Sequence, residues 1–121
     1  MPYSASGTEG SLSMFEFIES PLFERLVYDY LDDESYAAMQ VALARWPEAG
    51  DLIPGSGGCR KLRWRLPGRG KRGGARVIYY VKLRDGRIWL LAIYGKGATD
   101  NIPAHLLKAW KEACVHEEAN D

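Results

Sequence analysis

The chain has 121 residues, of which 46% are hydrophobic, so it can bury the core of one domain and is too short for two. Its sixteen basic and sixteen acidic residues give a formal net charge of zero. No apolar run approaches the ~20 residues of a membrane-spanning helix, and no basic start precedes an apolar core, so we expect a cytoplasmic protein without a secretory signal.

The two cysteines, Cys59 and Cys114, stand far apart in the sequence and have no neighbouring His or Cys. Metal-binding cysteines normally occur in closely spaced pairs, so we expect no metal site and no cofactor. Isolated thiols suit a reducing compartment better than a disulfide scaffold, although the spacing alone leaves their pairing open.

The first half of the chain predicts a tail, a strand and two helices. Residues 1–13 are rich in Ser and Gly without periodicity, so we expect a flexible tail, with Met14 as an alternative start of the biological chain. Residues 14–19 alternate apolar and polar side chains and predict a strand. Ser20 followed by Pro21 begins a helix near 21–31, and Asp32 with Asp33 begins another near 33–46.

The second half predicts three strands and a final helix. Residues 47–58 form a turn-rich connection that lacks the Lys-Ser/Thr ending of a phosphate-binding loop. The strands are 60–66, 75–83 (central) and 87–94 (covered on both faces); a basic, glycine-rich loop at 67–74 and a two-residue turn at Asp85-Gly86 connect them. A helix near 103–116 follows, capped by Thr99 or Asn101 and with Pro103 in its first turn. Residues 117–121 are an acidic, frayed end.

This order, β-α-α-β-β-β-α, predicts an α+β domain over residues 14–116 with a small antiparallel sheet. We expect the two N-terminal helices to pack on one face of the sheet. The other face should carry basic residues, at least at its centre.

Positive charge is concentrated in residues 59–96, which hold twelve of the sixteen basic residues and a single acid, Asp85. Within 60–66, the alternation places Lys61, Arg63 and Arg65 on one face of a strand. Clustered positive charge is typical of proteins that bind a polyanion, most commonly a nucleic acid. The alternative is a basic face that is simply well solvated.

Three segments, GGCRKLRW, GRGKRGGARVIYY and LLAIYGK, resemble the RelE/ParE superfamily of bacterial type II toxins, and most closely its HigB-type branch of RelE-like toxins. The resemblance covers about residues 14–114 and implies a β-α-α-β-β-β sheet, often with a C-terminal helix. RelE-like members are ribosome-dependent mRNA endonucleases held inactive by a cognate antitoxin. The resemblance therefore implies three partners: the ribosome, mRNA and an antitoxin, here expected to be a helix-turn-helix protein of the same operon.

Cleavage of RNA without a metal uses the 2′-hydroxyl of the substrate as nucleophile, and needs proton transfer and stabilisation of a phosphorane. The basic block contains no His or Glu pair for this purpose, and we expect His105 and His116 at the surface of the final helix. Lysine can transfer protons, arginine can clamp the phosphorane with two hydrogen bonds, and tyrosine can orient a hydroxyl or stack on a base.

The family pattern, carried over by position, implies a catalytic set in which Lys61 or Lys96 is the base or acid. Arg63 and Arg76 clamp the phosphate, and Tyr94 positions the substrate. Gly97 departs from members that have Arg after Gly-Lys, so the general base stays open.

The expected RNA-binding residues belong to the same basic block and surround these residues: Arg60, Arg65, Arg69, Lys71 and Arg72. Each cation of the first basic strand has the alternative of contacting only the RNA backbone, which positions the substrate without reacting. For the whole chain, the alternatives are a ParE-like inhibitor of DNA gyrase without nuclease activity, and a non-catalytic module that binds RNA or DNA.

Overall fold

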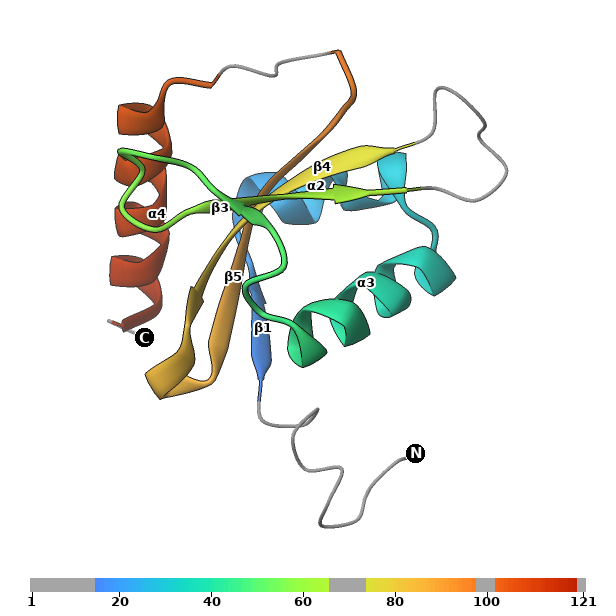
Figure 1. Cartoon of the computed structure of the whole chain (residues 1–121), viewed down its shortest axis with the longest axis horizontal. Helices are drawn as coiled ribbons and strands as arrows, with labels where there is room; N and C mark the ends of the chain where they lie inside the picture. Colours follow the sequence, from blue (N-terminus) through green and yellow to red (C-terminus); the bar gives the residue numbers. More distant parts are fainter. Residues whose placement is uncertain (1–14, 66–73, 98–101, 120–121) are drawn as a thin grey trace, which may run out of the picture.

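The computed structural model describes residues 15–65, 74–97 and 102–119. Figure 1 shows its helices and strands in chain order: β1 (Glu16–Glu19), α2 (Pro21–Tyr30), α3 (Asp33–Arg45), β2 (Asp51–Leu52), β3 (Arg60–Trp64), β4 (Ala75–Lys82), β5 (Arg87–Gly95) and α4 (Ala104–Ala119). The predicted α+β class is confirmed, and the order of elements is the predicted one with β2 added.

The five strands form one sheet in the order β1-β5-β4-β3-β2, so β4 is central, as predicted. Three pairs are antiparallel, whereas β1 runs parallel to β5 and makes the sheet mixed. Strand β2 lies inside the segment predicted as turns, and pairs Asp51 with Lys61 and Leu52 with Arg60. Two residues are too few to show the alternation that reveals a strand in a sequence.

The predicted two-residue turn at Asp85-Gly86 is wrong. Lys82 pairs with Arg87, and the connection between them includes a short 3₁₀ helix, Leu83–Asp85. Gly86 follows with φ 67°, and its N–H donates to the carbonyl oxygens of Lys82 at 3.1 Å and Leu83 at 3.2 Å. Asp-Gly is thus the end of a longer turn in which glycine supplies the left-handed conformation.

Both N-terminal helices begin as predicted. The hydroxyl oxygen of Ser20 accepts from the Phe23 N–H at 3.0 Å and donates to the Leu91 carbonyl at 2.9 Å, which ties the start of α2 to β5. The Asp32 carboxylate accepts from the Ser35 N–H at 2.8 Å and caps α3. The predictions for residues 1–13, for the cap at Thr99 or Asn101 and for most of the 67–74 loop lie outside the described residues.

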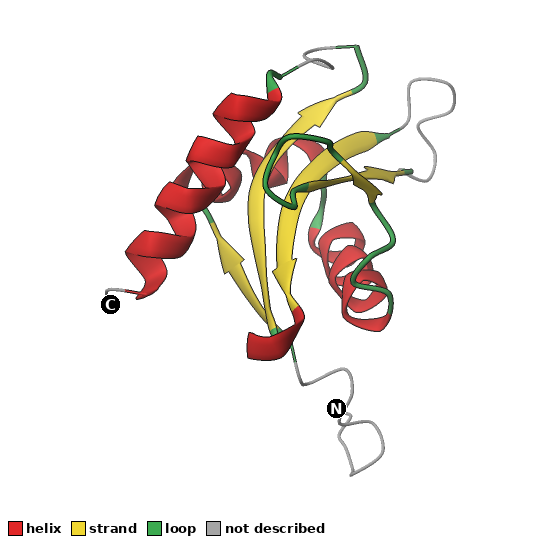
Figure 2. Cartoon of the chain, turned by 60° about the vertical axis from the view of Figure 1, so that its left-hand side comes forward, coloured by secondary structure: helices red, strands yellow, loops and turns green. Residues whose placement is uncertain are grey.

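The sheet has a hydrophobic cluster on each face. Phe23 of α2 and Met39 of α3 pack against Val77 and Tyr79 of β4, as predicted for the N-terminal helices. On the opposite face, Leu107 and Cys114 of α4 pack with side chains of β4 and β5: Ile78, Trp89, Leu91, Ala92 and Tyr94. Figure 2 shows α4 and α3 on opposite sides of the sheet. Both faces of β5 are therefore buried, as predicted.

Candidate active site

Strand pairing places Arg63, Arg76 and Tyr94 side by side on the face of the sheet that α4 partly covers. Arg63 of β3 is opposite Arg76 of β4, which is opposite Tyr94 of β5. Opposed residues of antiparallel strands point to the same face, and neighbouring strands are about 4.8 Å apart, so this row spans about 10 Å. A second row, two residues along the strands, contains Asp51, Lys61 and Ile78.

A β-bulge in β5 is the reason that Tyr94 belongs to the first row. The register shifts between Ile78, which faces Ala92, and Tyr79, which faces Leu90, so Leu91 is an extra residue. With an unshifted register, Leu91 would face Ile78 and Tyr94 would face Ala75, which belongs to the opposite hydrophobic core. Bulges are common next to active sites because they redirect a side chain without ending the strand.

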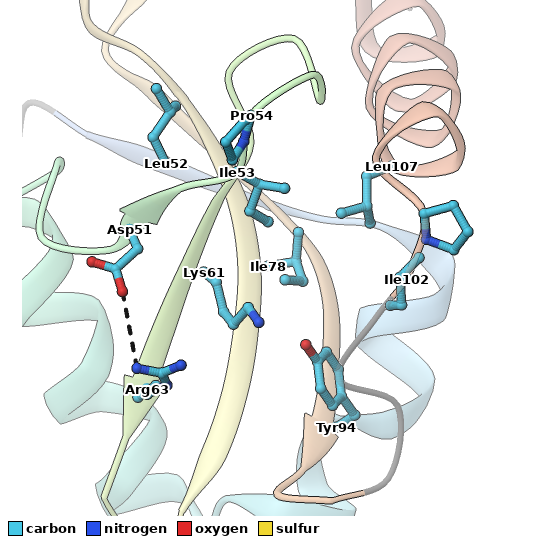
Figure 3. A pocket seen from close by; sticks show the side chains of 11 residues that line it. Asp51, Leu52, Ile53, Pro54, Lys61, Arg63, Ile78, Tyr94, Ile102 and Leu107 are labelled. Atoms are coloured by element: carbon cyan, nitrogen blue, oxygen red, sulfur yellow. Dashed lines mark ion pairs between the residues drawn. The ribbon is translucent and has the colours of Figure 1, made fainter.

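A cavity of about 440 Å³ opens beside these two rows, and Figure 3 shows its lining. One part is polar: the Lys61 ammonium and the Tyr94 hydroxyl point into it, and Arg63 lies at its margin. The rest is apolar and comes from β2 and the segment after it, from β4, from α4 and from the two residues that precede α4: Leu52, Ile53, Pro54, Ile78, Ile102, Pro103 and Leu107.

Asp51 is a polar residue of this cavity that the sequence analysis missed. Its Oδ2 lies 4.0 Å from Nη1 of Arg63, and the two side chains are 83% and 62% exposed. An ion pair this long and this exposed contributes at most about 1 kcal/mol, so it leaves Arg63 available to an anionic ligand. Asp51 lies outside the basic block, and only the pairing of β2 with β3 reveals its position.

The two remaining predicted catalytic residues, Arg76 of the first row and Lys96, do not line the cavity. Arg76 is half-buried, its Nε is buried, and its Nη1 lies 3.6 Å from where a side-chain carbon at Gly74 would be. Lys96 follows the end of β5 and is exposed. Of the two lysines left open as base or acid, Lys61 is the one that lines the cavity.

The two predicted RNA-binding residues that the structure describes, Arg60 and Arg65, are not brought together. Arg60 faces the other side of the sheet, where its Nη1 donates to the carbonyl oxygens of Gly50 at 2.8 Å and Glu48 at 3.2 Å. Arg65 is exposed and lines a second cavity with Trp64, beside the α2–α3 corner. The other three lie outside the described residues: Arg69, Lys71 and Arg72.

Arg60 and Tyr79 together hold the turn that leads into β2. The Tyr79 hydroxyl donates to the Pro47 carbonyl at 2.7 Å and accepts from the Gly50 N–H at 2.9 Å. Burial raises the pKa of Tyr79, so the hydroxyl stays protonated and remains a donor at neutral pH. These contacts fix the chain just before Asp51, and thereby position one side of the cavity.

Ser56 fixes the same wall from within. Its buried hydroxyl donates to the Ile53 carbonyl at 2.6 Å and accepts from the Cys59 N–H at 3.0 Å. The Ile53 N–H in turn donates to the Cys59 carbonyl at 2.9 Å. Residues 53–59 thus form a closed loop whose apolar side chains are held in place before any ligand arrives.

The cysteines and histidines do not contribute to this site. Both thiols are buried and unpaired, and burial raises the pKa of Cys59 and brings that of Cys114 to about 11. They are therefore protonated at neutral pH and poor nucleophiles. His105 and His116 are exposed on α4, as predicted. Over the described ranges, no three His, Cys, Asp or Glu side chains form a group that could hold a metal ion.

No model of a known protein family matches this chain. Among solved structures, the chain is similar to a mutant of the E. coli toxin RelE in the free state, with 13% sequence identity and a TM-score of 0.49 over 85% of this chain and 96% of that one. At an identity this low, the similarity gives no information about the activity of this chain. Within the described part of the chain, no helix has the length and apolarity needed to cross a membrane.

Proposed function

We propose that this chain is the toxin of a type II toxin–antitoxin system, of the HigB-type branch of RelE-like toxins. It would act as a metal-independent, ribosome-dependent endoribonuclease that cuts mRNA and stops translation. The observation that carries this proposal is the strand register. It aligns Arg63, Arg76 and Tyr94 on one face, with Lys61 beside them, at the margin of a cavity.

Arg63 and Arg76 are suited to hold the phosphate that is cut. They face each other across β3 and β4, so their guanidinium groups can approach one phosphate from two sides. Arginine stays charged and can donate two parallel hydrogen bonds to phosphate oxygens. Such donors contribute most when the phosphorane carries its extra negative charge, which lowers the barrier for cleavage.

Lys61 is suited to transfer the proton, because it is the lysine whose side chain enters the cavity. In its neutral form it takes the proton of the 2′-hydroxyl as that oxygen attacks the adjacent phosphorus. It then returns the proton to the 5′-oxygen as the P–O5′ bond breaks, which leaves a 2′,3′-cyclic phosphate and a 5′-hydroxyl. Tyr94 orients the ribose by a hydrogen bond from the opposite wall.

The proposed partners are the ribosome, mRNA and a cognate antitoxin, expected to be a helix-turn-helix protein of the same operon. The ribosome would supply the mRNA in a fixed, unstacked conformation, which a small cationic face cannot impose alone. A small helix-turn-helix reading frame directly beside this gene would support the assignment.

The test is to add the purified protein to translating ribosomes with a defined mRNA, and to map the 5′ ends of the products. We expect cuts inside translated codons. Arg76→Ala should lower the cleavage rate at least about 100-fold and abolish growth arrest on expression, because it removes a donor to the phosphorane. Arg84→Ala is the matched control: Arg84 is exposed on the 3₁₀ helix that connects β4 and β5, and this variant should cut normally.

The proposal is wrong if Arg76→Ala remains as toxic as the parent while both variants fold. A supercoiling assay with DNA gyrase separates the ParE-like alternative. Inhibition of supercoiling with intact mRNA would replace the proposed function with gyrase inhibition. Binding of RNA without cleavage, on or off the ribosome, would leave a non-catalytic module.

A further inference from the structure

We infer that the apolar part of the cavity is a binding site for one nucleobase of the RNA, next to the phosphate held by the cations. This inference rests on the proposed function only in taking RNA as the ligand. It assigns a role to the seven aliphatic residues of the cavity, which have no role in the chemistry of cleavage.

The shape and lining of the cavity support a flat, uncharged group. Its volume of about 440 Å³ is within the range of ~300–1,000 Å³ for pockets that bind small molecules. Pro54 and Ile53 lie on one side, and Ile102 and Leu107 lie on the other, as Figure 3 shows. A base between them would bury both of its faces against aliphatic carbon, which removes apolar surface from water.

The wall is rigid enough to act as a preformed site. Ser56 and the backbone of Ile53 and Cys59 close the loop on one side. Leu107 is only 5% exposed, and Gly55 lies against α4, where an added side-chain carbon would be 3.5 Å from Ala104 Cβ. Because these side chains are already ordered, binding of a ligand carries little free-energy cost for ordering the site.

The neighbouring charges identify the ligand as part of a nucleotide. The apolar part meets Lys61, Arg63 and Tyr94, which can bind the phosphate and ribose of the same residue. A purely apolar ligand would leave these cations unused, and a free anion would leave the aliphatic wall exposed. Because the aliphatic side chains cannot hydrogen-bond to a base edge, the site should favour large bases without reading their identity.

The test uses the full chain with labelled isoleucine methyl groups, observed by NMR. The ligand is a dinucleotide with 2′-O-methyl ribose and two adenines, which cannot be cleaved by the 2′-oxygen. The comparison ligand is the same molecule with both bases removed. We expect the dinucleotide to shift the methyl signals of Ile53, Ile78 and Ile102, and to leave those of Ile18 and Ile88 in place.

We also expect the ligand without bases to bind at least about fivefold more weakly, the low end of what stacking one base contributes. Ile53→Trp fills the apolar part and should remove this difference, whereas Leu106→Trp, at a 52% exposed position of α4, should keep it. Arg63→Ala should weaken both ligands by the same factor.

The inference is overturned if removal of the bases leaves the affinity unchanged, or if the shifts occur at Ile18 and Ile88 instead. These readouts do not depend on cleavage. Base-dependent shifts at the cavity without cleavage on ribosomes would support the base site and refute the endoribonuclease. Cleavage on ribosomes with equal affinity for the two ligands would refute the base site alone.

Discussion

Replacing Tyr79 with Phe should destabilise the protein by about 2–3 kcal/mol. The hydroxyl makes two hydrogen bonds, to the Pro47 carbonyl at 2.7 Å and from the Gly50 N–H at 2.9 Å, and the second is buried. A typical hydrogen bond contributes about 1 kcal/mol net, and a buried N–H left without a partner costs ~1–3 kcal/mol. The ring itself is retained, so the loss comes from the hydroxyl group alone.

Urea unfolding followed by circular dichroism measures this loss. With a slope of about 1–3 kcal/mol per molar urea, the midpoint should fall by roughly 0.7–3 M at an unchanged slope. Tyr80→Phe is the control, because Tyr80 points to the opposite face and packs by its ring against Trp89 and Lys111. Its midpoint should change little. Equal midpoints for the Tyr79 and Tyr80 variants would refute the role assigned to the Tyr79 hydroxyl.

Three further predictions concern the surroundings of the site. Gly50→Ala should cost about 1–3 kcal/mol in the same unfolding assay, because its new carbon would lie 2.8 Å from Tyr79 Cε1; an unchanged midpoint would contradict this. Asp51→Asn should tighten RNA binding up to about fivefold in a fluorescence anisotropy titration, since it removes a charge that repels phosphate and holds Arg63 at 4.0 Å; weaker binding would show that Asp51 supports the site instead. Because burial raises the pKa of the Cys114 thiol from 9.0 to about 11, its contribution to stability is present below pH 9 and lost as the pH rises through 11. Between pH 8.5 and 11, wild type should lose about 2 kcal/mol more unfolding free energy than Cys114→Ala, and parallel losses would exclude this linkage.

The class, the caps and the basic strand could be predicted because they depend on local patterns. The alternation of 60–66 identified Lys61 and Arg63 as sharing a face, and the structure places both beside the cavity. The same alternation put Arg60 on the other face, yet the charge count alone grouped it with the RNA-binding residues. Its hydrogen bonds to Gly50 and Glu48 depend on a turn that comes earlier in the chain and has no periodic signal.

Two features of the site depend on register, which the sequence does not display. Residues 87–94 are almost uniformly apolar, so no alternation marks Leu91 as the extra residue that directs Tyr94 to the cationic face. Asp51 is brought opposite Lys61 by a strand of two residues. Both features depend on which backbone groups pair across the sheet, and each adds one side chain, Tyr94 or Asp51, to the candidate site.

Because β1 pairs in parallel with β5, the N-terminal part of the chain cannot reach its final structure during synthesis until β5 has been made. Ser20 and Leu91, which hydrogen-bond, are 71 positions apart, so α2 has no sheet to dock on until β5 has been made. At synthesis rates of ~5–20 residues per second, this gap lasts roughly 4–14 s. We expect a chain truncated after Lys82 to be unfolded by circular dichroism, and a folded truncation would show otherwise. Incomplete chains would therefore lack the candidate site, because Tyr94 of β5 and the cavity residues Ile102, Pro103 and Leu107 are made late in synthesis.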